Sequence, residues 1–224
     1  KTGISKALTQ YSRSIDVNKF GGRFKYSKAV SLIDSVDSSI TSNITLVTIR
    51  RNLRAVTGQF AQYELCFGNK FNINPAGYNV KSTGFTINGF NDTAYITDIP
   101  NKNTAGNLDG SNMGTLSVVT KNNKGEQRVV VKDAGVVDYK KGEVILNTIN
   151  ITSTVSQNNI IEVQAFPESN DVVGLKDLYL SFDVSKSTIN TIKDVIASGE
   201  DVSGVVFTRD YYTSSYSNGD LERK

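Results

Sequence analysis

Apolar residues recur at helical spacing near the start of the chain. Ile4, Leu8, Tyr11 and Ile15 follow one another at intervals of four or three residues, so they share one face of a predicted α-helix. The two glycines after Phe20 supply the backbone freedom of a turn, and the helix should end before them.

A second helix is predicted from Ser27 to about Val36. Ser27 is a suitable N-cap for it. Its apolar face consists of Ala29, Val30, Ile33 and Val36. The β-branched run at 44–49 then predicts a strand, so the first part of the chain predicts two helices followed by a strand.

The central part of the chain, 62–150, consists of short apolar runs separated by Gly, Asn and Asp. Its clearest strands are 126–132, 136–139 and 143–146, and the two loops between them end in glycine, which is typical of a β-meander. Shorter strands are predicted at 63–67, 85–87 and 94–96. Residues 101–114 predict a long mobile loop, because few of them are apolar.

The last third predicts mixed structure. Strands are expected at 160–166, 178–182 and 205–207. Between the last two, a third helix is expected to begin at Ser185 or Ser187 and to end at Gly199. Its apolar face consists of Ile189, Ile192, Val195 and Ile196.

These elements predict an α+β (mixed α/β) fold. Helices and strands from both chain ends should form one part, 1–60 with 157–208. A β-rich meander subdomain, 61–156, is inserted into that part, and a polar aromatic tail follows at 209–224.

Composition restricts the chemistry that this chain can perform. Its 224 residues include no His, no Trp and a single Cys. A Ser-His-Asp or Cys-His catalytic group, an internal disulfide and a Cys/His zinc site are therefore excluded within the chain. We expect no enzymatic activity, no metal and no cofactor.

The charge and hydropathy of the chain narrow the classes of partner that it can bind. The 25 Lys and Arg residues exceed the 22 Asp and Glu residues by +3, which is too little for a dedicated nucleic-acid or membrane-surface binder. No apolar run approaches the ~20 residues that span a bilayer. The chain does not begin with Met and has no apolar signal core, so we expect a piece of a longer protein.

The remaining reactive groups favour structural roles. Cys66 lies within a predicted strand with no base beside it, which indicates a packed or partly packed thiol. The carboxylate pairs in the sequence are typical of turns and helix ends, and they are Asp34 with Asp37 and Glu200 with Asp201. The basic cluster at the end of the first predicted strand indicates a solvated edge or the rim of a protein interface, and it consists of Arg50, Arg51 and Arg54.

Several stretches together resemble a known family. The segments 4–8, 26–30 and 33–37, followed by the run into the strand at 44–51, are similar to the baseplate J-like family of contractile phage tails. The stretches 63–69 and 135–144 resemble, more narrowly, the C-terminal half of T-even-type baseplate wedge proteins of the gene-product-six type. The resemblance does not cover 101–114 or the residues after Asp210.

The resemblance implies a structural virion protein without enzymatic activity or cofactor. Such wedge subunits form dimers, join neighbouring wedges into a ring, and rearrange when the sheath contracts. The implied partners are a second copy of the chain and other wedge subunits, and the implied location is the tail baseplate, after assembly in the host cytoplasm.

Two other functions remain open. A β-rich glycan- or receptor-binding module of a phage or surface protein would suit the polar loop and the tyrosines of the tail, although sugar-binding platforms often use Trp. A hydrolase based on two carboxylates is the third possibility.

The first helix suggests where self-association could occur. Its stripe, Ile4, Leu8, Tyr11 and Ile15, needs a second surface, and the other predicted helix can serve the core by itself. A ring-forming subunit would supply that surface from a second copy. We therefore predict a protein interface at this stripe, the alternative being that the stripe packs within its own chain.

Overall fold

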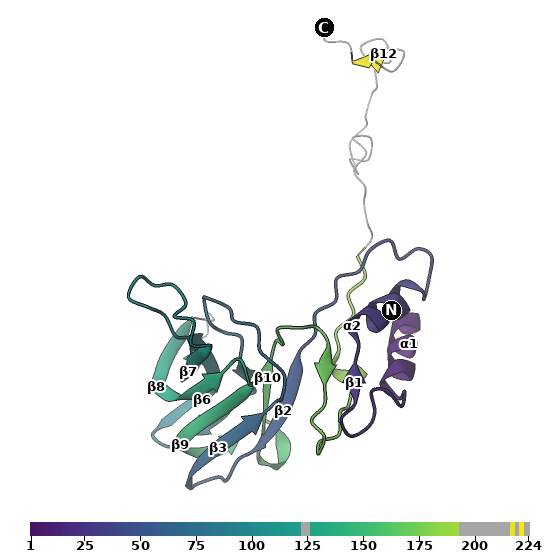
Figure 1. Cartoon of the computed structure of the whole chain (residues 1–224). Helices are drawn as coiled ribbons and strands as arrows, with labels where there is room; N and C mark the ends of the chain where they lie inside the picture. The colour runs from purple at the N-terminus through teal and green to yellow at the C-terminus, as the bar shows by residue number, and fades with distance from the viewer. Residues whose placement is uncertain (122–125, 193–215, 218–219, 222–224) are drawn as a thin grey trace, which may run out of the picture. The chain divides into compact units, whose positions relative to one another are not determined.

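The structure is a computed structural model of the whole chain (Figure 1). It describes residues 1–121, 126–192, 216–217 and 220–221. The chain divides into two units, Lys1–Thr188 and Ile189–Lys224. In the second unit, β12 (Tyr216–Ser217) pairs antiparallel with β13 (Asp220–Leu221). The other helices and strands of the described residues belong to the first unit.

Five antiparallel strands of the first unit close into a barrel. Each is hydrogen-bonded to two others in the ring β5–β6–β7–β8–β9, and β9 returns to β5. Closure leaves none of these strands as a continuous free edge. The barrel strands are β5 (Phe85–Ile87), β6 (Phe90–Pro100), β7 (Met113–Lys121), β8 (Gln127–Asp138) and β9 (Glu143–Thr154).

The barrel closes because its long strands bend. Within β8, Asp133 has φ 59°, and the register with β7 shifts between Val131 and Gly135. A Cβ on Gly135 would lie 2.1 Å from the Ile145 carbonyl oxygen, so only glycine permits this close approach of β8 to β9. The turn predicted at 133–135 is therefore wrong, and these residues form a bulge inside one strand.

Further strands extend the barrel into a nine-stranded sheet that ends at β2. β3 pairs with β9, β4 pairs with β6, and β10 lies between β4 and β2. The added strands are β2 (Ile49–Arg54), β3 (Phe60–Cys66), β4 (Lys81–Ser82) and β10 (Ile160–Ala165).

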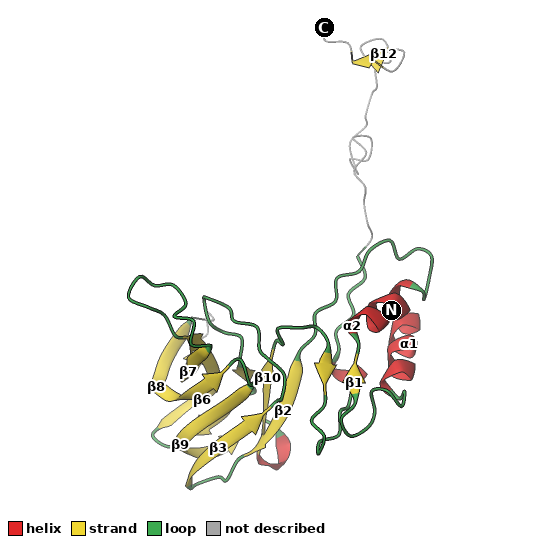
Figure 2. Cartoon of the chain, in the orientation of Figure 1, coloured by secondary structure: helices red, strands yellow, loops and turns green. Residues whose placement is uncertain are grey.

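A helical layer packs beside this sheet and is here called the N-terminal layer (Figure 2). The layer contains two α-helices and a two-stranded sheet of β1 and β11. Among the described residues, the first unit also contains two short 3-10 helices, η1 and η2. Their bounds are α1 (Thr2–Ser12), β1 (Arg23–Phe24), α2 (Tyr26–Asp34), β11 (Val172–Val173), η1 (Gln157–Asn159) and η2 (Val184–Lys186). One buried cluster runs from Tyr11 and Phe24 in the layer to Phe85 and Leu116 in the barrel, so both regions share a core.

The α+β prediction is wrong, because the chain is mostly β. Within the part of the chain that the structure describes, strands account for 41% and helix for 14%, and both α-helices of that part lie within the first 34 residues. Short apolar runs in the centre predicted short meander strands, whereas the strands continue through the intervening Gly and Asp residues and close a barrel. Strands 63–67, 85–87, 94–96 and 160–166 are confirmed to within a few residues.

Three other predicted elements need correction. Residues 44–48 are not in a strand, and pairing begins only at Ile49, where β10 provides a partner. Residues 178–182 contain a single bridge, Phe20 with Tyr179, rather than a strand. The predicted third helix is absent from residues 187–192, and its remainder lies outside the described residues, as do most of the tail and the strand at 205–207.

Candidate functional site

The stripe predicted as an interface is mostly covered by its own chain. Ile4, Leu8 and Tyr11 are buried, whereas Ile15 is 80% exposed because α1 ends at Ser12. The Tyr11 hydroxyl accepts a hydrogen bond from the Lys25 backbone N–H at 2.9 Å. Whether the end of this helix also meets a second copy stays a prediction.

The other candidate groups of the sequence lie apart from one another. Cys66 is partly buried at the end of β3, which agrees with a partly packed thiol. Asp34, at the end of α2, accepts a hydrogen bond from Asn43 Nδ2 at 2.5 Å, and Asp37 accepts one from the Ser39 N–H at 2.9 Å within a local turn, so both carboxylates have structural contacts. Glu200 and Asp201 lie outside the described residues. Within 1–121 and 126–192, no cluster of three or more His, Cys, Asp or Glu could hold a metal.

One carboxylate is buried inside the barrel region. Asp98 is 1% exposed, and its two oxygens accept hydrogen bonds from the Tyr139 hydroxyl and the Val80 N–H, both at 2.6 Å. Burial raises the pKa of Asp98, and these hydrogen bonds oppose the rise. The pKa of Tyr139 is also raised, by burial first and then by the Asp98 charge. Asp98 thus fastens the segment before β4 to the barrel and faces no solvent-filled cleft.

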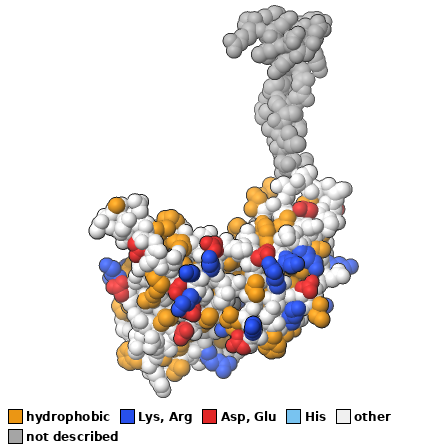
Figure 3. Space-filling view, viewed as in Figure 1, with side chains coloured by type: hydrophobic (Ala, Val, Ile, Leu, Met, Phe, Trp, Pro, Cys, Tyr) orange, Lys and Arg blue, Asp and Glu red, His pale blue; other side chains and the backbone are white. Residues whose placement is uncertain are grey.

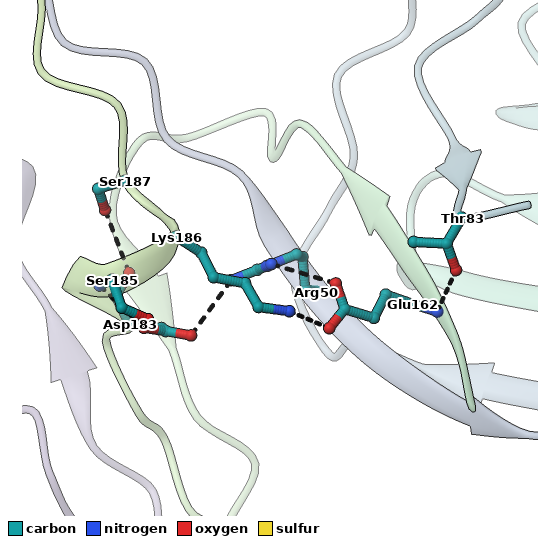
Figure 4. Close-up of polar contacts among 7 residues, drawn as sticks. All are labelled: Arg50, Thr83, Glu162, Asp183, Ser185, Lys186 and Ser187. Atoms are coloured by element: carbon teal, nitrogen blue, oxygen red, sulfur yellow. Dashed lines mark hydrogen bonds and ion pairs between the residues drawn. The ribbon is translucent and has the colours of Figure 1, made fainter. Parts of the chain in front are cut away.

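A group of charged side chains joins the N-terminal layer to the sheet (Figure 4). Arg50 of β2 lies 3.4 Å from Glu162 of β10 and 3.7 Å from Asp183 beside η2, and Lys186 of η2 also pairs with Glu162. We call Arg50, Glu162, Asp183 and Lys186 the polar clamp. A hydrogen bond from Ser185, more than the Arg50 charge, lowers the pKa of Asp183.

The polar clamp fixes a segment that also packs into the N-terminal layer. Phe182, just before the clamp, lies 5.3 Å from the ring of Phe24 and 6.4 Å from that of Tyr11. Residues 182–186 therefore bridge the layer and the sheet. The sequence singled out Arg50, but it gave no sign that Glu162 and Asp183 would be its partners, because more than a hundred residues separate them from it.

Two of the three most exposed apolar side chains of the N-terminal layer lie on an extended segment, 43–48, which we call the open strand. Ile44 is 91% exposed and Leu46 is 78% exposed, whereas Asn43, Thr45 and Val47 between them are half-buried. Apolar side chains are visible at the surface along the path that this segment takes in Figure 1 (Figure 3). The alternation of the sequence here predicts a paired strand, and the structure provides the extended chain without the partner.

A second exposed apolar feature is an aromatic pair. Phe20 and Tyr179 are 64% and 53% exposed, and their rings meet edge to face at 5.3 Å. The Tyr179 hydroxyl donates to the Asn18 carbonyl at 2.8 Å, which holds the pair in place. Exposed apolar groups of this kind are typical of surfaces that contact other proteins.

Comparison with known proteins adds one similarity. No helix among the described residues is long and apolar enough to cross a membrane. No curated protein matches the chain. Residues 1–52, which include α1, β1, α2, the open strand and the start of β2, match the model of a family described as baseplate structural protein gp6, C-terminal domain III. The N-terminal 52 of the 224 residues are thus similar to a structural protein of the phage baseplate.

Proposed function

We propose that this chain is a structural subunit of a contractile phage tail baseplate and acts through contacts with other proteins. The observation that carries the proposal is the family match over residues 1–52. Its location adds support, because the matched residues include the most exposed apolar side chains of the N-terminal layer, Ile15, Ile44 and Leu46.

The finer role follows the same similarity. The chain would belong to a baseplate wedge, form dimers, join neighbouring wedges into a ring, and rearrange when the sheath contracts. It would be made in the host cytoplasm and act in the virion. The closed barrel suits a rigid spacer, since each of its five strands is paired on both sides within the ring, and β9 and β6 pair further with β3 and β4.

The end of α1 is a proposed part of the contact surface. Ile4, Leu8 and Tyr11 would fix the helix from within, and the exposed Ile15 would reach the second copy. An Ile15→Asp variant of the 224-residue chain should then associate more weakly in sedimentation while it keeps its circular dichroism. Unchanged association would remove α1 from the contact surface and leave the baseplate role open.

The baseplate role is tested by locating the protein in particles. Gold-labelled antibodies against the chain are applied to purified contractile-tailed particles from the source of the gene and imaged by negative-stain electron microscopy. We expect label at the end of the tail that is distal to the head. Label confined to the head or to fibres, or no label on disrupted tails, would contradict the proposal.

A further inference from the structure

We propose that the open strand, residues 43–48, pairs antiparallel with the open strand of a second copy of this chain about a two-fold axis. The unpaired backbone, the sequence and the flanking charges of the open strand support this contact. Its biological role rests on the proposed function, because it supplies the surface through which a wedge subunit would associate with itself.

The backbone of the open strand is available for pairing. Across 44–47, no backbone N–H donates a hydrogen bond to another described residue, and the Thr45 carbonyl accepts one from the Tyr26 hydroxyl at 3.2 Å. Tyr26 thereby holds the strand extended from one side. Unpaired N–H and C=O groups on an extended chain form a template for another strand.

The sequence of the open strand contains none of the features that keep free strands single. Residues 41–49, TSNITLVTI, include no charged residue, no Pro and no Gly, and six of the nine are β-branched. Exposed edges that remain unpaired usually carry Lys, Pro or a bulge. Without them, Ile44 and Leu46 stay exposed on a segment of high β-propensity.

The charges at the two ends of the segment identify the occupant. Asp37 precedes the open strand, Arg51 and Arg54 follow it, and none of the three forms an ion pair with a described residue. Antiparallel pairing of two copies brings the acidic end of each toward the basic end of the other. The segment is therefore complementary to itself, and pairing with an identical strand satisfies both ends at once.

The apolar side chains fix the register. Pairing centred on Thr45 sets Ile44 of each copy opposite Leu46 of the other, so the two most exposed apolar residues of the strand cover each other twice. A shift by one residue would place them opposite inward-facing positions. Six residues per copy form a small contact, so we expect weak association of the free chain and stronger association where several contacts act together in a ring.

Sedimentation of the full 224-residue chain over a concentration series tests the pairing. An Ile44→Asp, Leu46→Asp double variant should raise the dimer dissociation constant by about tenfold or more, since each charge opposes an apolar side chain or another Asp. The matched control is Phe60→Asp, which changes a residue that is 71% exposed on β3, and it should associate like the parent. Circular dichroism checks that all chains fold.

Disulfide trapping tests the register without adding charge. Ile44→Cys and Leu46→Cys are made separately in a Cys66→Ser background, one chain carrying a size tag. Opposed residues in an antiparallel pair lie ~4.5–5.5 Å apart at Cα, within disulfide reach. Mixing the two variants under mild oxidation should give a cross-linked heterodimer far faster than mixing either with a Val129→Cys control.

The outcomes separate this inference from the proposed function. If the parent and the double variant associate equally, or if no heterodimer forms, the strand pairing is wrong while the baseplate role stands. If the parent is monomeric and only another baseplate protein binds in a manner sensitive to Ile44, the second copy is the wrong occupant. Loss of tail-end antibody label overturns the baseplate role even where the cross-link forms.

Discussion

The barrel completes its own strand pairing, whereas the N-terminal layer leaves a strand unpaired. In the barrel, Phe85, Leu116 and Val137 are fully buried, and the ring closes from β9 back to β5. In the layer, Ile44 and Leu46 of the open strand face solvent. The difference indicates that the barrel leaves no strand of its ring unpaired, whereas the layer keeps backbone groups available for a partner, although the two regions share a core.

The two regions also differ in what they resemble. The family match ends at residue 52, inside β2, so it covers α1, β1, α2 and the open strand of the layer but not β11, and it stops where the nine-stranded sheet begins. The part similar to a baseplate protein is therefore the part with the unpaired strand. The barrel could differ between relatives without altering that surface, provided that the shared core between the regions is kept.

The largest expected effect comes from the barrel core. Phe85→Ala removes a fully buried ring and should lower the free energy of unfolding by about 3–5 kcal/mol, because the surrounding strands cannot collapse into the cavity. Phe90→Ala, on the neighbouring strand and 45% exposed, is the matched control and should cost far less. Urea denaturation of both variants measures the difference.

The same denaturation experiment sharpens the comparison at the open strand. Ile44→Ala should change the stability of the dilute, monomeric chain by less than about 0.5 kcal/mol, since the side chain is 91% exposed. A loss comparable to that of Phe85→Ala would show that Ile44 serves the fold, and the contrast between the two regions would fail.

The sequence predicted local elements well and their closure poorly. The alternation of apolar residues identified β3, β5 and β10, because each is a short run between turn residues. Closure depends on Gly135 approaching Ile145 and on the bulge at Asp133, and neither has a local pattern that distinguishes it from a turn. The sequence pattern alone therefore does not predict that the strands close into a barrel.

The candidate site was predictable only in part for a similar reason. The helical stripe at Ile4, Leu8 and Tyr11 is apolar whether it packs inside the chain or against another copy, and periodicity does not separate the two cases. The run at 44–49 carries a genuine strand pattern, but its partner strand β10 ends at Ala165, before Pro167, so the chain pairs only from Ile49 onward. A pattern reports what a segment can pair with, not whether the partner is present.

At the buried carboxylate of Asp98, we expect a loss of stability that is smaller than that of Phe85→Ala. Asp98→Ala leaves the Tyr139 hydroxyl and the Val80 N–H without an acceptor, but it also removes the free-energy cost of burying a carboxylate. The net loss in the free energy of unfolding should be about 2 kcal/mol. Chemical denaturation at neutral pH measures the loss, and Tyr139→Phe, which removes one donor, should cost less. No loss would mean that the barrel does not depend on this contact.

The same group gives a pH dependence with a definite sign. Burial raises the pKa of Asp98 above its ordinary value of 3.8, so the folded chain holds the proton more tightly than the unfolded chain does. The contribution of Asp98 to stability is therefore greatest below pH 3.8 and falls as the pH rises through the raised pKa. The stability difference between the parent and Asp98→Asn should shrink across that window, and a difference that grows would contradict the assignment.

A small loss of stability is also expected at the polar clamp, which joins the N-terminal layer to the sheet. Arg50→Met removes the ion pairs to Glu162 and Asp183, but all three groups are partly exposed, so the loss should be at most about 1 kcal/mol. Lys186 keeps its pair with Glu162, which limits the effect further. The loss should diminish in about 1 M NaCl, where the Debye length falls to ~3 Å.

The clamp also determines how firmly residues 182–186 hold the layer to the sheet. In Arg50→Met, amide exchange of this segment should accelerate while that of β7 and β9 in the barrel stays unchanged, because local opening exposes only the bridge. Arg54→Met is the matched control, since Arg54 lies on the same strand without an ion pair to a described residue. Faster exchange throughout the barrel in Arg50→Met would mean that the two regions open as one, and the distinction between a closed barrel and a layer with an unpaired strand would then not extend to local opening.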